Sequence, residues 1–70
     1  MDEAQKKLIS EISHEVKGPL TTINLYSEAL ISGSVGPLTD EQKDYLNEIH
    51  TASKKLITRV NALADKAKQS

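Results

Sequence analysis

The chain has 70 residues, with nine lysines and arginines against ten aspartates and glutamates, and no cysteine, tryptophan or phenylalanine. That length allows one small domain, and a monomer of this size buries only about 60% of the surface that its unfolded chain exposes. The lack of cysteine excludes disulfides and thiolate metal sites, and two histidines without convergent carboxylates make a metal core improbable. Of the usual ways to stabilise a small fold, oligomerisation remains.

The net charge of −1, with both signs interspersed, argues against a nucleic acid as the main partner. The longest apolar runs have two or three residues, so none could span a membrane or form the apolar part of a signal peptide. We therefore expect a cytoplasmic segment without membrane contact of its own.

The first helix is predicted over residues 3–32. Apolar residues recur there at alternating spacings of three and four, which is typical of helices packed side by side. This first apolar series comprises Ile9, Ile12, Val16, Pro19, Ile23, Tyr26 and Leu30. Leu8, Leu20 and Ile31 lie beside the series and widen it into the stripe of a bundle helix. The sustained period-two alternation of a strand is missing.

The most informative segment of this helix reads Ser-His-Glu-Val-Lys-Gly-Pro-Leu over residues 13–20. His14 lies about 200° around the helix from the apolar residues two positions before and after it, so it points into solvent. An exposed histidine is ordinarily a stray surface residue. Here, however, Glu15 can hydrogen-bond one imidazole nitrogen and leave the other as a nucleophile. Gly18, one turn further on, leaves space beside the ring.

Pro19 lies in the middle of the predicted helix, where it removes one backbone hydrogen bond and clashes with the carbonyl of Glu15. An interior proline costs about 3 kcal/mol in a helix, so a bend this close to an exposed histidine is expected to serve a function. The alternative is a helix that ends at Lys17, which gives three helices instead of two. The first apolar series continues through Pro19, which favours a bend.

A turn rich in glycine, serine and proline is predicted over residues 33–38, and the second helix over 39–67. The second helix starts with a capping box, in which the Thr39 hydroxyl accepts from the Gln42 amide and the Gln42 side chain returns to Thr39. A second apolar series follows: Leu46, Ile49, Ser53, Leu56, Val60, Leu63 and Ala67, with Ile57 and Ala64 beside it.

Both apolar stripes are too wide for one helical hairpin to cover. Two hairpins related by a two-fold axis would close an all-α, homodimeric four-helix bundle. His50 flanks the second apolar series and is expected to be a partly buried or rim histidine. Four lysines at or near this helix are expected to be solvated flanks: Lys54, Lys55, Lys66 and Lys68.

The segment around His14 resembles the H-box of sensor histidine kinases, whose commonest form is Ser-His-Glu-Leu-Arg-Thr-Pro-Leu. Two stretches, Leu-Thr-Asp-Glu-Gln-Lys-Asp-Tyr-Leu from Leu38 and Leu-Ile-Thr-Arg-Val-Asn-Ala-Leu-Ala-Asp from Leu56, are similar to the second helix of that family's dimerisation and histidine-phosphotransfer domain (DHp, or HisKA-like). The resemblance covers nearly all of residues 1–70. It implies a homodimeric antiparallel four-helix bundle in two-component signal transduction, and the segment can be the cytoplasmic part of a membrane-anchored sensor.

By this resemblance His14 is the phosphoacceptor, Glu15 is the general base during autophosphorylation, and Lys17 places a positive charge near the phosphoryl group. The chain has none of the family's Asn and Gly-rich nucleotide boxes, no Walker-type loop and no Gly-x-Gly. It is therefore expected to bind no cofactor and no metal. ATP and Mg²⁺ would be held by a catalytic domain absent from this chain, which acts only as part of a protein-histidine kinase (a phosphotransferase).

The expected partners are a second copy of the chain, the ATP-binding domain and the receiver domain of a response regulator, whose aspartate takes the phosphoryl group from His14. The receiver domain is expected to dock on the helix face that carries the histidine, and this His14 face comprises His14, Gly18, Thr21, Thr22, Leu25 and Ala29. Leu25 could serve there as an apolar contact, or it could be a bundle residue of a slightly rotated helix.

Gly18 stands where the family usually has a threonine or asparagine that positions water to dephosphorylate the regulator, which puts phosphatase activity in doubt. Two other functions remain open. His14-x-x-Lys17-Gly18 also resembles the motif of monomeric histidine phosphotransfer proteins in phosphorelays, although those need a longer chain and lack the Pro-Leu continuation. A bundle adaptor without chemistry is the other, but it would gain nothing from His14, Glu15 and the Pro19 bend.

Overall fold

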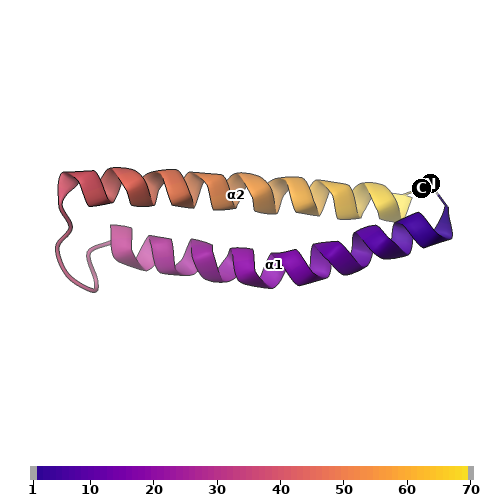
Figure 1. Ribbon diagram of the computed structural model, residues 1–70, viewed down its shortest axis with the longest axis horizontal. Helices are drawn as coiled ribbons and strands as arrows, with labels where there is room; N and C mark the ends of the chain where they lie inside the picture. Colours follow the sequence, from indigo (N-terminus) through magenta and orange to yellow (C-terminus); the bar gives the residue numbers. More distant parts are fainter. Residues whose placement is uncertain (1, 70) are drawn as a thin grey trace.

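The computed structural model describes residues 2–69, which form two antiparallel α-helices joined by one turn (Figure 1). Helix α1 spans Glu3–Ile31 and helix α2 spans Asp40–Gln69. They lie side by side in an elongated hairpin with extents of 50 × 15 × 13 Å, and the start of α1 and the end of α2 meet at one end. The all-α hairpin is confirmed, and the dimer stays a prediction.

Both helices begin with a capping box. At α2, the Thr39 amide donates to Gln42 Oε1 over 2.9 Å and the Gln42 amide donates to Thr39 Oγ1 over 3.1 Å, as predicted. At α1, the Gln5 amide donates to Asp2 Oδ1 over 2.8 Å, and the Asp2 amide donates back to Gln5 Oε1 over 3.3 Å. This first cap was not predicted. The two boxes satisfy amides that have no partner within their helices.

The turn depends on two glycines with positive φ. Gly33 has φ 81° and Gly36 has φ 138°, values that residues with a side chain rarely adopt. Ser32 caps the end of α1 and its hydroxyl donates to the carbonyl of Ala29 over 2.8 Å. The chain therefore leaves α1 and reverses before Thr39 starts α2.

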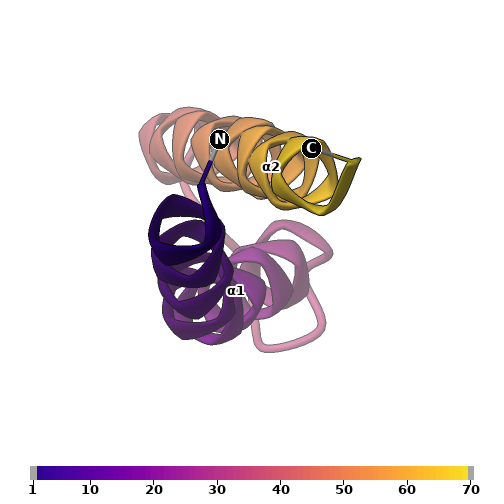
Figure 2. The same ribbon diagram turned by 90° about the vertical axis from the view of Figure 1, so that its right-hand side faces the viewer.

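Helix α1 remains helical through Pro19, so the alternative in which it ends at Lys17 is wrong. Figures 1 and 2 show that α1 bends along its length, with its indigo and magenta halves running in different directions. Proline has no amide hydrogen, so the carbonyl of Glu15 lacks its helical donor, and this is an established cause of helix bending.

The contact between α1 and α2 is centred on residues that lie within or beside the two predicted apolar series, with Ser27 as the exception. The most buried described residues are Leu20, Ser27, Ser53 and Ala67, which expose 9%, 3%, 4% and 4% of their surface. The first apolar series is only partly covered by α2, and its members Ile12, Ile23, Tyr26 and Leu30 are exposed in the hairpin. The reason is angular, because Leu20 and Ser27 lie roughly 60° around α1 from the centre of that series. Two helices that cross bury only the part of the apolar stripe that lies at their contact.

Polar side chains hold the middle of this contact. Asn24 Nδ2 donates to Ser53 Oγ over 3.3 Å, and the Ser53 hydroxyl donates to the carbonyl of His50 over 2.9 Å. The Ser27 hydroxyl donates to the carbonyl of Asn24 over 2.9 Å. Buried hydroxyl and amide groups are tolerated because each has a partner.

Several of the exposed apolar side chains lie on one side of the hairpin. Two shallow depressions of about 310 and 270 Å³ open there, and both are lined by residues of α1 and α2, with Ile49 common to the two. Tyr45 lies in the first, and its hydroxyl donates to Glu41 Oε1 over 2.7 Å, which raises the pKa of the phenol. We call this side the open apolar face, and its main residues are Ile12, Ile23, Tyr26, Leu30, Ile49, Leu56 and Leu63.

The hairpin has no enclosed core. None of the larger side chains described is fully buried. The radius of gyration is 15.7 Å, against about 11 Å for a compact domain of 70 residues. The accessible surface is 5434 Å², which exceeds by roughly 1,100 Å² the value expected for a compact monomer of this mass.

Candidate functional site

His14 lies on the side of α1 away from the open apolar face, at the edge of the groove between α1 and α2. The residues of α1 that contact α2 and those of the open apolar face occupy neighbouring sides of the helix. At about 100° per residue, the centre of the His14 face lies on the remaining side. His14 is exposed, as the spacing predicted. Substitution of its ring would therefore remove little packing.

The structure brings His14 together with residues of both helices. A shallow depression of about 170 Å³, which we call the His14 depression, lies between α1 and α2. Its lining comprises Ser10, Ser13, His14 and Lys17 from α1 and Asn61, Ala64 and Lys68 from α2. Lys17, expected near the phosphoryl group, thus lies beside the ring. The residues of α2 were not predicted. Pairing about the midpoint of the 33–38 turn would place His14 opposite Ile57, whereas the depression brings it together with Asn61 and Ala64.

Glu15 is exposed beside His14. Among the described residues, neither side chain forms a hydrogen bond or an ion pair. Adjacent helical positions point about 100° apart, so the two groups do not face each other without a change of rotamer. The hydrogen bond expected between Glu15 and His14 is therefore not formed here, and the role of Glu15 as general base stays a prediction.

Gly18 leaves open space one turn from His14. A Cβ built at Gly18 would meet no atom within 4 Å outside its own helix backbone. The neighbouring threonines are already engaged, because Thr21 Oγ1 donates to the carbonyl of Lys17 over 2.8 Å and Thr22 Oγ1 donates to that of Gly18 over 3.2 Å. Their hydroxyls serve the backbone around Pro19.

Leu25 exposes 59% of its surface on the His14 face and lines neither depression of the open apolar face. Ala29 is half-buried at the end of the same face. The role of Leu25 in docking stays a prediction, and so does the alternative in which it is a bundle residue.

His50 differs from His14 in its surroundings. Its side chain is only 20% exposed, and its Nε2 lies 3.0 Å from Glu28 Oε1 across the hairpin. The prediction of a rim histidine is confirmed. Within residues 2–69 no group of three or more His, Asp or Glu side chains could hold a metal ion. Neither described helix has a stretch apolar enough to cross a membrane.

Comparison with known proteins gives consistent matches over most of the chain. Residues 4–70 match the His Kinase A (phospho-acceptor) domain family. The chain is 32% identical over 68 residues to the Non-motile and phage-resistance protein of Caulobacter vibrioides, and the match covers 96% of this chain and 8% of that protein.

Two further relatives are named as histidine kinases. Circadian input-output histidine kinase CikA of Synechococcus elongatus is 32% identical over 62 residues, which cover 89% of this chain and 8% of that protein. Sensor histidine kinase GlrK of Escherichia coli K12 is 31% identical over 65 residues, which cover 93% of this chain and 14% of that protein. The chain thus spans between 8% and 14% of these relatives. No solved structure gives a significant match.

Proposed function

Because the chain belongs to the His Kinase A (phospho-acceptor) domain family of two-component histidine kinases, we propose that His14 is the side chain that accepts the phosphoryl group. The chain has two histidines, and their surroundings support this choice. His50 is held against Glu28, whereas His14 is exposed at the edge of a depression with a lysine beside it. That exposure of His14, on a face free of apolar packing, is the observation that carries the proposal.

In the proposed step, one imidazole nitrogen of His14 attacks the γ-phosphorus of ATP. The N–P bond forms as the bond from that phosphorus to the bridging oxygen of ADP breaks, and the proton on the other ring nitrogen passes to the Glu15 carboxylate. Lys17 offsets charge on the phosphoryl oxygens. ATP and Mg²⁺ are held by a separate ATP-binding domain, so this chain supplies the acceptor and its positioning.

The phosphoryl group then passes to an aspartate of a response-regulator receiver domain, which docks on the His14 face. Leu25 supports this proposal as an exposed apolar residue that no neighbouring helix covers. Gly18 supports it as well, because a residue without a side chain lets another backbone approach the ring.

We further propose that residues 1–70 act as one dimerisation and phosphoacceptor domain, in which a second copy covers the open apolar face. The excess surface of roughly 1,100 Å² is more than the ~800 Å² that each partner of a standard interface buries. Two such hairpins complete a four-helix bundle. The lack of an enclosed core supports this proposal over a monomeric phosphotransfer protein.

The test is to replace each histidine in turn. His14→Gln should abolish phosphorylation by ATP, Mg²⁺ and the kinase's ATP-binding domain, while His50→Gln should retain it. Phosphate that is acid-labile and base-stable identifies the phosphohistidine. Far-ultraviolet circular dichroism checks that both variants keep their helices. Phosphorylation of His14→Gln, or its loss in a folded His50→Gln alone, would overturn the assignment.

A further inference from the structure

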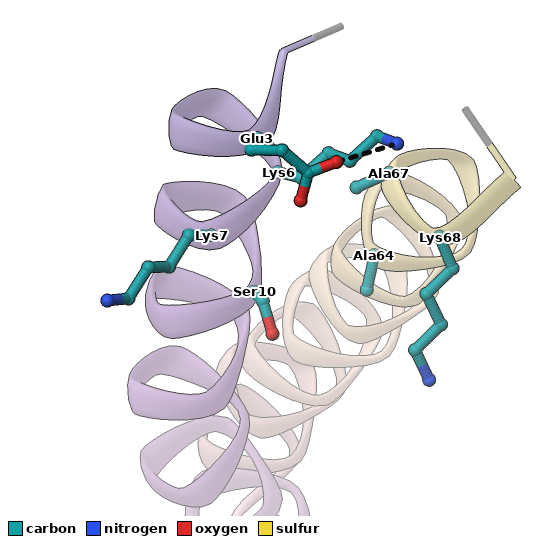
Figure 3. Close-up of a pocket in the computed structure, with 7 residues that line it drawn as sticks. All are labelled: Glu3, Lys6, Lys7, Ser10, Ala64, Ala67 and Lys68. Atoms are coloured by element: carbon teal, nitrogen blue, oxygen red, sulfur yellow. Dashed lines mark ion pairs between the residues drawn. The ribbon is translucent and has the colours of Figure 1, made fainter.

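A depression of about 340 Å³ opens where the start of α1 meets the end of α2 (Figure 3). Three lysines line it: Lys6, Lys7 and Lys68. It is continuous with the His14 depression, because Ser10, Ala64 and Lys68 line both. The ring of His14 therefore lies at one end of a groove with a basic lining.

The three lysines of this groove are not equivalent. Lys6 is paired with Glu3, with Nζ 3.7 Å from Oε1, and Figure 3 shows this pair over Ala67. Lys7 points away from α2 (Figure 3). Lys68 lies along α2 with its amine directed away from the chain ends, and it is the only one of the three that also lines the His14 depression (Figure 3). No carboxylate of the described residues forms an ion pair with it.

We propose that Lys68 is a positioning residue for the phosphoryl group on His14, acting from α2 opposite Lys17 on α1. The proposal rests on the proposed function of His14. A phosphoryl group carries close to two negative charges at neutral pH and attracts ammonium groups on either side. Since the two lysines belong to different helices, their separation depends on the register of the hairpin, and the pair forms only when α1 and α2 are docked.

The proposal predicts electrostatic assistance with any small phosphoryl donor, which removes the need for an ATP-binding domain in the test. Phosphoramidate is such a donor. An imidazole nitrogen of His14 attacks its phosphorus, the N–P bond to His14 forms, and the P–N bond of the donor breaks. Ammonia leaves with the proton that the ring loses. Phosphohistidine is measured by ³¹P NMR and located by mass spectrometry of peptides.

The experiment compares the 70-residue chain with Lys68→Gln, Lys68→Arg and Lys55→Gln. Lys55→Gln makes the same change of net charge on the opposite side of α2, so it controls for long-range charge. At low ionic strength, Lys68→Gln should phosphorylate His14 about twofold to fivefold more slowly, the range expected for exposed charge pairs. Lys68→Arg should restore the rate and Lys55→Gln should leave it unchanged. The difference should shrink at 1 M salt, where the Debye length is about 3 Å.

Three results would overturn the proposal. One is an unchanged rate in Lys68→Gln, and another is an equal loss in Lys68→Gln and Lys55→Gln, which indicates net charge alone. The third is a loss in Lys68→Gln that salt does not reduce, which indicates a structural role. Absence of phosphate on His14 in the unsubstituted chain would instead overturn the assignment of His14, and the role of Lys68 with it.

Discussion

Glu15 follows His14 directly, yet no hydrogen bond joins its carboxylate to the ring, so the proposed general-base role requires that bond to form during the reaction. Glu15→Ala should slow phosphorylation of His14 by the ATP-binding domain by about 10²–10⁴-fold, the usual worth of a general base. Transfer from His14 to the regulator should lose less, because the receiver's own aspartate and metal ion perform that step. Single-turnover rates in each direction measure the two effects.

The matched control for this prediction is Glu15→Gln, which keeps the shape of the side chain but cannot take a proton. Both variants should be slow in the first step. An active Glu15→Gln would contradict the general-base role, and equal losses in both directions would make Glu15 a structural residue.

Gly18 offers no hydroxyl or amide side chain to hold a water molecule in line with an aspartyl phosphate. The unsubstituted domain should therefore be a weak phosphatase, and Gly18→Thr should speed the decay of phosphorylated regulator. Positioning is most of what a protein supplies in phosphoryl transfer, so one added hydroxyl can have this effect. Open space at the Cβ position means that the variant should fold.

Gly18→Ala separates chemistry from helix stability. It should stabilise α1 by roughly 0.5–1 kcal/mol, because glycine is a poor helix former, and it should leave the decay of the regulator unchanged. Faster decay with Gly18→Ala, or strong phosphatase activity of the unsubstituted domain, would mean that another residue holds the water. Thr21 and Thr22 would be tested next, although their hydroxyls now donate to backbone carbonyls.

At the scale of the helices, Pro19 removes one backbone hydrogen bond from α1 close to the proposed acceptor. Pro19→Ala should restore a donor to the Glu15 carbonyl and raise the free energy of unfolding, by up to about 3 kcal/mol. It should also slow phosphorylation of His14, since a straighter α1 carries the ring in another direction. Urea unfolding and the rate of phosphorylation are the two measurements.

Pro37→Ala is the matched control, because Pro37 lies in the turn and outside both helices. It should change neither the direction of His14 nor the phosphorylation rate. A Pro19→Ala variant that is more stable and equally active would show that the bend has no role in the reaction.

The helices themselves were largely predictable because their signals are local. Thr39 and Gln42 are three residues apart, and the glycines of the turn adopt conformations that few other residues tolerate. Ser53 was predicted as part of the second apolar series, but its partner was not, because Asn24 is polar and lies outside the first apolar series. An apolar pattern identifies surfaces that are unfavourable in water. It does not say whether the other helix or a second copy of the chain buries each one.

The same distinction holds for the site. The exposure of His14 followed from its spacing to apolar neighbours, which is a property of one helix. Lys68 was expected to be a solvated flank, since its place beside His14 depends on how α2 is aligned with α1. That alignment brings together residues that are far apart in the sequence, such as Ser10 and Ala64, which line the same depression.

At the scale of the whole molecule, the hairpin exposes the apolar surface that a partner would cover. Leu56→Asp should dissociate the proposed dimer and unfold it together, because an unpaired charge in the centre of a bundle is strongly unfavourable. Sedimentation velocity and circular dichroism at micromolar concentration should show loss of the dimer and of helix content in the same variant.

Leu25→Asp is the matched control, because Leu25 is at least as exposed as Leu56 in the hairpin, at 59% against 45%, but lies on the His14 face. It should keep the dimer and slow transfer to the regulator. A folded monomer of the unsubstituted chain, or a Leu56→Asp variant that remains dimeric, would contradict the four-helix bundle.

The missing hydrogen bond at Pro19 also gives α1 a mechanical property. A helix bends most easily where a backbone hydrogen bond is missing. In α1 this point separates the half that carries His14 from the half that carries Leu25. At 1.5 Å per residue, a change of about 10° in the bend would move the start of α1 by about 4 Å and the backbone of His14 by about 1 Å. A misplacement of about 1 Å at reacting groups can change a rate by about 100-fold. A small tilt at the end of the hairpin where α1 starts can therefore cause a large change in the phosphorylation rate of His14, which lies five residues from the bend at Pro19.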